Sequence, residues 1–193
     1  GADYGVAEAG TLFSATTIYI TPTTLSGITA NFLMSLAGGL LMGYVISKGD
    51  PFWTYSSGLA GIITASAGND LYHPLQAMII AAIGVAIMYK LHYWVERRFK
   101  IDDAVGAVAV HGYAGVVGLV ICGFVLWGYP SSAYEGYAAI NPLGMIIGAV
   151  IMFVLVVAAA YGLSQVISAR AAYIHIGAML GTIMVANVWV HIL

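Results

Sequence analysis

Charged residues are scarce in this sequence. Asp, Glu, Lys and Arg make up only 7% of its 193 residues, whereas soluble domains carry about 25%. The formal net charge is only −2, so the sequence also lacks the basic excess expected of a nucleic-acid-binding protein. With 61% hydrophobic residues, the composition excludes a soluble domain. It indicates an integral membrane protein whose main partner is the lipid bilayer.

Cysteines and catalytic motifs are also scarce. Cys122 is the only cysteine, which excludes a disulfide within the chain and a cysteine metal cluster. The sequence contains no Cys-x-x-Cys-His haem-attachment site, no glycine-rich phosphate loop and no Ser-His-Asp order. Asp102 and Asp103 are adjacent and would point apart on a helix, so they do not form an acid–base pair. The sequence therefore predicts a protein that is not an enzyme and holds no cofactor.

Long apolar runs dominate what is present. A membrane-spanning helix needs about 20 mostly apolar residues. The runs here are continuously apolar rather than alternating, which favours an all-α, polytopic helical membrane protein over a β-barrel. We expect six or seven transmembrane helices, near residues 27–47, 53–69, 74–95, 104–127, 140–167 and 172–192, with the seventh near 9–22.

The basic residues predict the orientation. Counting along these spans places all six on one side of the membrane: Lys48, Lys90, Arg97, Arg98, Lys100 and Arg170. By the positive-inside rule that side, with the loop around 96–103, is cytoplasmic. We therefore expect a multi-pass protein of the cell (inner) membrane. His92 lies close to this interface, where a histidine typically snorkels or contacts headgroups.

The most informative stretch begins at Asp102 and Asp103, either of which can cap a helix start. Eight residues after Asp103, His111 would lie about 12 Å deeper along the helix axis. An ionisable residue at that depth is a functional candidate, because charge is costly there. A neutral imidazole costs less and can donate and accept a hydrogen bond at once. The alternative is a structural histidine bonded to a neighbouring helix.

The stretch Asp102–Gly118 resembles the tenth-helix motif of the ammonium transporter family, which includes the Amt, Mep and Rh proteins. Three further segments support the resemblance. Gly58–Ile63 is similar to that family's eighth helix, Ala139–Gly144 to the entry of its last helix, and Thr21–Met34 to the join between its sixth and seventh helices. Together they cover roughly residues 10–153, and we assign 1–153 to an ammonium-transporter-like region.

The resemblance implies transport of ammonium or ammonia, as in an ammonia channel, usually by a homotrimer with one hydrophobic pore per subunit. His111 matches the second member of a histidine pair in the pore. Asp103 matches a structural aspartate at the helix start, and Gly112 and Gly115 flank the lumen. Bare ammonium is penalised in an apolar passage whereas ammonia is not, so the histidines could take up and relay the proton.

The chain departs from the family in two ways. The family has about eleven spans in two inverted halves with the pore between them, and this sequence resembles only the second inverted repeat. A lone second half should not form a pore unless another chain supplies the first, so this sequence is expected to provide only half of a pore. The tail, residues 154–193, instead resembles the helical membrane domain of bacterial membrane-bound urate oxidase (urate hydroxylase).

Two alternatives to transport stay open. The chain could be a haem-binding subunit of a membrane electron-transfer complex, with His111, His175 or His191 as ligand. It could also be a structural subunit that packs against other membrane subunits. A Soret band would favour the first, and a fully packed His111 the second.

Overall fold

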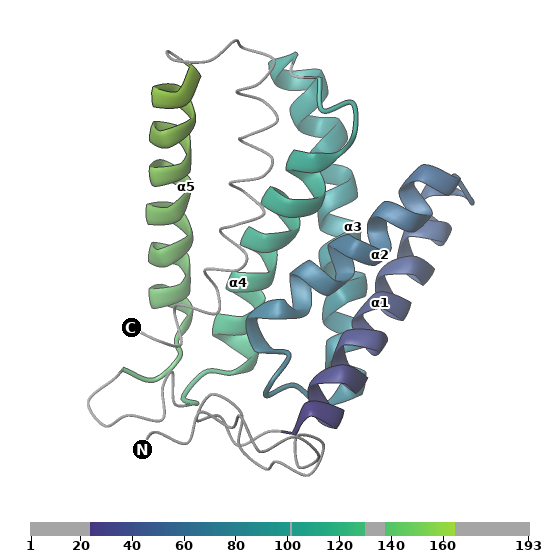
Figure 1. Ribbon diagram of the computed structural model, residues 1–193, viewed down its shortest axis with the longest axis vertical. Helices are drawn as coiled ribbons and strands as arrows, with labels where there is room; N and C mark the ends of the chain where they lie inside the picture. Colours follow the sequence, from purple (N-terminus) through teal and green to yellow (C-terminus); the bar gives the residue numbers. More distant parts are fainter. Residues whose placement is uncertain (1–23, 101, 130–137, 165–193) are drawn as a thin grey trace, which may run out of the picture.

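The computed structural model describes residues 24–100, 102–129 and 138–164, and the regular elements of these residues are helices (Figure 1). In chain order they are α1 (Leu25–Ser47), α2 (Pro51–Ala65), the 3₁₀ turn η2 (Ser66–Gly68), α3 (Pro74–Phe99), the π-helical segment η3 (Val108–Tyr113), α4 (Ala114–Val125) and α5 (Pro142–Ser164). The predicted all-α fold is confirmed.

Within the described residues, four helices are long and apolar enough to cross a membrane: Leu25–Ser47, Pro74–Phe99, Val108–Val125 and Pro142–Ala159. They coincide with four of the predicted spans, which confirms a polytopic helical membrane protein. The spans predicted near 9–22 and 172–192 lie outside the described residues. The total of six or seven spans therefore stays a prediction.

The helix α2 differs from the span predicted over 53–69. It has 15 residues, or roughly 22 Å, against a hydrocarbon core of about 30 Å. The three residues of η2 continue it only to Gly68. The element lies where the sequence predicts it, but it is shorter than a full span.

Side-chain and backbone caps explain where the helices begin and end. The Thr24 hydroxyl accepts a hydrogen bond from Gly27 N at the start of α1 (2.9 Å), and Asp50 Oδ1 accepts from Trp53 N at the start of α2 (2.9 Å). Lys48 and Lys100 end α1 and α3 with φ angles of 58° and 57°. This left-handed conformation turns the chain away from the helix.

The first three helices pack on one another, and α4 packs against α2 and α3. In Figure 1, α1 and α5 lie at opposite sides of the molecule, and α5 contacts the rest through α4. The path alternates in direction. The C-terminal ends of α1, α3 and α5 are therefore at one end of the molecule, and the N-terminal ends of these helices are at the other (Figure 1).

Glycines let these helices approach closely. A Cβ atom on Gly39 of α1 would collide with Ser57 O of α2, and one on Gly61 would lie 2.7 Å from Ser35 O. Thr64 of α2 fits between Gly84 of α3 and Gly118 of α4, and a Cβ on either glycine would collide with it. In lipid the hydrophobic effect does not drive helices together, so these contacts depend on small residues that let the backbones pack closely.

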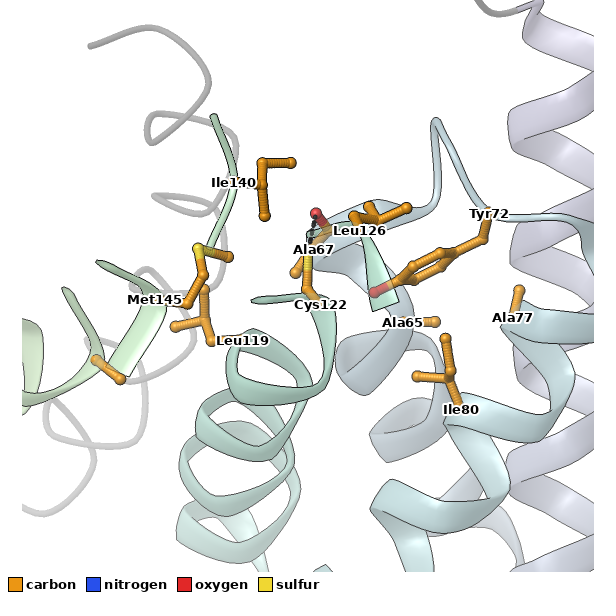
Figure 2. Close-up of a cluster of buried hydrophobic side chains, with 11 residues drawn as sticks. Ala65, Ala67, Tyr72, Ala77, Ile80, Leu119, Cys122, Leu126, Ile140 and Met145 are labelled. Atoms are coloured by element: carbon orange, nitrogen blue, oxygen red, sulfur yellow. Dashed lines mark hydrogen bonds between the residues drawn. The ribbon is translucent and has the colours of Figure 1, made fainter. Parts of the chain in front are cut away.

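The core divides into two clusters near the two ends of the molecule. Figure 2 shows the cluster formed where α2 and α4 end and where α3 and α5 begin, with Tyr72, Cys122 and Leu126 at its centre. Its cysteine donates to Ala67 O at 3.3 Å, the dashed line in Figure 2. The second cluster joins the start of α2 to the end of α3 and to η3, around Trp53 and Met88.

Most charged residues of the described chain lie at the end of the molecule that holds the cluster around Trp53 and Met88. Lys48 directly follows α1, whereas Arg97, Arg98 and Lys100 close α3. These helix ends lie at the same end of the molecule (Figure 1). Asp70 lies in the turn before α3, at the other end. This distribution matches the predicted orientation, although which end is cytoplasmic stays a prediction.

Candidate functional site

His111 lies in a π-helical turn, a feature that the sequence does not predict. The segment Val108–Tyr113 carries it, and Ala114 N bonds back to Ala109 O, five residues earlier. Such wide turns are rare and are found frequently at functional sites. Gly106, with a φ of 62°, makes the sharp turn before this segment. A residue with a Cβ atom would be strained in that conformation.

The His111 side chain is only partly covered by the described residues. Its neighbours Ala109 and Val110 are buried, at 0% and 4% exposure, in the cluster around Trp53 and Met88. The backbone is therefore anchored in the core while the imidazole lies at the edge of the packed helices. Among the described residues, none forms a hydrogen bond or ion pair with this ring. The alternative of a histidine bonded to a neighbouring helix gains no support from them.

Asp103 is the residue that caps the His111 segment. Its Oδ1 accepts a hydrogen bond from Val108 N (3.2 Å) and its Oδ2 accepts one from Ala109 N (2.9 Å). Both donors belong to the first turn, where backbone N–H groups have no partner within the helix. Asp103 O also accepts from Gly106 N at 2.8 Å, which closes the turn. Asp102, the other capping candidate, is exposed.

The glycines that follow His111 on its helix differ in how deeply they are buried. Gly115 and Gly118 are buried, whereas Gly112 is partly exposed beside His111. Gly118 faces α2 at Thr64, so this part of the flank packs against the other helices. The structure does not test whether Gly112 and Gly115 line a lumen, and that assignment stays a prediction.

Three further histidines have expectations from the sequence, and only one of them lies in the described residues. His92, expected to snorkel at the interface, is instead buried at 5% exposure because α3 turns it toward the ring of Trp53. The haem candidates His175 and His191 lie outside the described residues. Within the described ranges there is no group of three or more His, Cys, Asp or Glu residues that could hold a metal ion.

Comparison with known proteins decides the family. The sequence matches the family model described as Ammonium Transporter Family over residues 5–185. This chain belongs to the ammonium transporter family. It is 31% identical over 147 residues to ammonium transporter Amt2 of Methanocaldococcus jannaschii, covering 74% of this chain and 33% of that protein. Amt1 of the same organism is 27% identical over 135 residues, covering 69% of this chain and 33% of that protein.

A third ammonium transporter relative, Amt2 of Archaeoglobus fulgidus, is 29% identical over 124 residues, or 62% of this chain and 25% of that protein. The chain thus spans about a third of the length of the first two relatives. No solved structure matches it. The family match continues into the tail, to residue 185. The resemblance of residues 154–193 to urate oxidase is unconfirmed, and the division at residue 153 stays a prediction.

Proposed function

We propose that this chain takes part in moving ammonium or ammonia across a membrane, as one half of a pore that passes beside His111. The observation that carries the proposal is the match of residues 5–185 to the ammonium transporter family. The relatives that it matches are themselves named ammonium transporters. His111 follows the buried residues Ala109 and Val110, and its side chain is only partly covered by the described residues, which agrees with a site that further helices complete.

The imidazole suits this transport for a physical reason. Ammonium loses its hydration on entering an apolar passage, whereas ammonia loses little, so desolvation favours the neutral species. A proton must then leave the ion at the passage and join it again on exit. A neutral imidazole accepts at one nitrogen and donates at the other, so it can receive and return that proton.

The rest of the pore would come from protein beyond the described residues. The chain spans a third of the length of its first two relatives. Its outer helices carry large uncovered apolar side chains, including Leu143 and Val154 on α5, at 67% and 58% exposure. These faces need lipid or further helices around them. A trimer in the cell inner membrane, with the basic end cytoplasmic, is part of the same proposal.

Uptake of methylammonium by transporter-deficient cells tests the proposal. The native full-length protein should restore uptake, and His111→Ala should lower it at least tenfold, because alanine cannot exchange a proton. His73→Asn is the matched control. It replaces a histidine in the exposed turn before α3, and asparagine can still cap that helix. It should leave uptake unchanged.

Expression and size-exclusion profiles of each variant separate loss of transport from loss of folding. If well-folded His111→Ala transports as fast as the native protein, His111 does not line the pathway. If the native protein gives no uptake at all, this chain is not a transporter of ammonium.

A further inference from the structure

A second histidine, His92, is buried between two carboxylates close to the start of the His111 segment. Its Nε2 lies 3.4 Å from Glu96 Oε1, one helical turn later on α3, and its Nδ1 lies 3.6 Å from Asp103 Oδ2. The imidazole side chain is 6% exposed and that of Asp103 is 9% exposed. These are the two side-chain ion-pair contacts found among the described residues.

Aromatic packing fixes the direction of this ring. Trp53 of α2 meets it edge-on, with ring centroids 4.7 Å apart, and Tyr93 contacts it at 5.0 Å. The Trp53 indole donates to the Tyr93 hydroxyl at 2.8 Å, which holds both neighbours in place. The His92 ring therefore has little freedom to turn its Nδ1 away from Asp103.

The Nδ1 atom of His92 is fully buried and has no hydrogen-bond partner among the described residues. A buried polar nitrogen without a partner is costly, and the acceptor that it faces is Asp103 Oδ2, a few tenths of an ångström beyond hydrogen-bond range. No lysine or arginine of the described chain pairs with Asp103. The Nδ1 atom of His92 is thus a donor placed opposite this carboxylate.

Asp103 in turn holds the segment that carries His111. Its two carboxylate oxygens accept from Val108 N and Ala109 N, the first amides of the π-helical turn. Its own backbone N–H donates to Glu96 Oε1 at 3.4 Å. Glu96, His92 and Asp103 therefore tie the end of α3 to the beginning of η3.

We propose that His92 is a positioning residue, whose Nδ1–H donates to Asp103 and thereby fixes the π-helical turn at His111. Ionised carboxylates only accept hydrogen bonds. A neutral imidazole between two of them can donate to one, whereas the imidazolium cation can donate to both. The bond to Asp103 needs only a proton on Nδ1, which either form can supply. For transport, this role rests on the proposed function of His111, but the hydrogen bond itself does not.

Hydrogen–deuterium exchange of the full-length protein in nanodiscs tests the bond directly. The amides of Val108 and Ala109 report the cap, because they donate to Asp103. His92→Phe keeps an aromatic ring against Trp53 but has no donor. We expect it to speed exchange of these two amides about tenfold, as much as Asp103→Ala does. In the double variant, His92→Phe with Asp103→Ala, these amides should exchange no faster than in Asp103→Ala alone, since both changes break the same connection.

Two conservative variants distinguish this role from packing alone. In His92→Asn the side-chain amide lies near the place of Nδ1 and can still donate to Asp103, whereas in His92→Gln it lies near Nε2 and faces Glu96. We expect slow exchange at Val108 and Ala109 with asparagine and fast exchange with glutamine. Peptides from α1 should exchange as in the native protein and so report intact folding.

Unchanged exchange in His92→Phe, or equal exchange in the asparagine and glutamine variants, would overturn the positioning role. If the phenylalanine variant does not fold, the asparagine and glutamine pair decides the question. Methylammonium uptake is then measured on the same variants. His92→Gln should lower the maximal rate while the KM stays the same, and His92→Asn should retain the native rate. A native protein without uptake would refute the proposed function and leave the exchange result standing.

Discussion

Asp102 and Asp103 are neighbours in the sequence, yet only Asp103 bonds to the His111 segment. Asp103 is nearly buried and accepts from two backbone N–H groups, whereas Asp102 is exposed. An unmet pair of N–H groups at a helix start destabilises the protein, and more so away from water. The two residues therefore provide a matched pair for measuring what the cap contributes.

Asp103→Ala should lower the free energy of unfolding by about 1–2 kcal/mol, the usual cost of losing a helix cap. Asp102→Ala should change it by less than about 0.5 kcal/mol, as exposed substitutions do. Thermal stability in detergent, followed by tryptophan fluorescence, measures both. Equal stability of the two variants would show that the bonds to Val108 and Ala109 contribute nothing measurable.

At the level of single residues, the sequence singles out His111 and narrows the cap of its segment to Asp102 or Asp103, but it misplaces His92. His111 is recognisable because it is the one histidine within the apolar run near residues 104–127. His92 lies near Lys90, Trp94 and Arg97, a setting typical of an interface. Its burial depends on contacts with Trp53 and Asp103, which are distant in sequence. A pattern of polarity along one helix contains no information on such contacts.

Helix packing depends on glycine contacts, which supply another test. A Cβ atom on Gly118 would collide with Thr64 O, whereas Gly148 on α5 has open space around its Cα atom. Gly118→Ala should therefore push α4 away from α2 and lower the melting temperature by several degrees, the effect of roughly 1–3 kcal/mol of overpacking. Gly148→Ala should leave it unchanged or raise it slightly, since alanine favours helix by up to about 1 kcal/mol.

Melting curves of the two purified variants, taken in the same detergent, check this expectation. Equal melting temperatures would mean that α2 and α4 separate at no cost. The sequence alone does not say which glycines face a neighbouring helix. That distinction comes from the paths of the helices, which place Thr64 between Gly84 and Gly118.

At the level of helices, the sequence predicts position better than length or type. Hydrophobic runs locate α1, α3, α4 and α5, because apolarity over about 20 residues is a local property. Hydropathy along the chain does not predict the end of α2 at Ala65 or the π-helical turn at Val108–Tyr113. The first depends on how η2 and the following turn pack, and the second on a shared cap from Asp103.

The whole molecule is polar at one end and apolar along its sides. Its described basic residues lie at the end where α1 and α3 terminate, or in the last turns of α3. Asp70 lies at the opposite end, separated from Arg97 by the length of α3. With 26 residues, that helix is about 39 Å long, enough to cross the hydrocarbon core. The positive-inside rule then predicts that Arg97 faces the cytoplasm and Asp70 the outside.

Cysteine labelling in intact cells tests that orientation, and the native chain provides a low background because its single cysteine, Cys122, is buried. Asp70→Cys and Arg97→Cys place a thiol at each end, and neither changes the orientation signal greatly. Acidic residues contribute little to that signal, and Lys48, Lys90, Arg98 and Lys100 remain. A membrane-impermeant maleimide should label Asp70→Cys in intact cells, and Arg97→Cys only after the membrane is opened. The reverse labelling pattern would show that the orientation is opposite to the predicted one, with the carboxylates around His92 on the outer side.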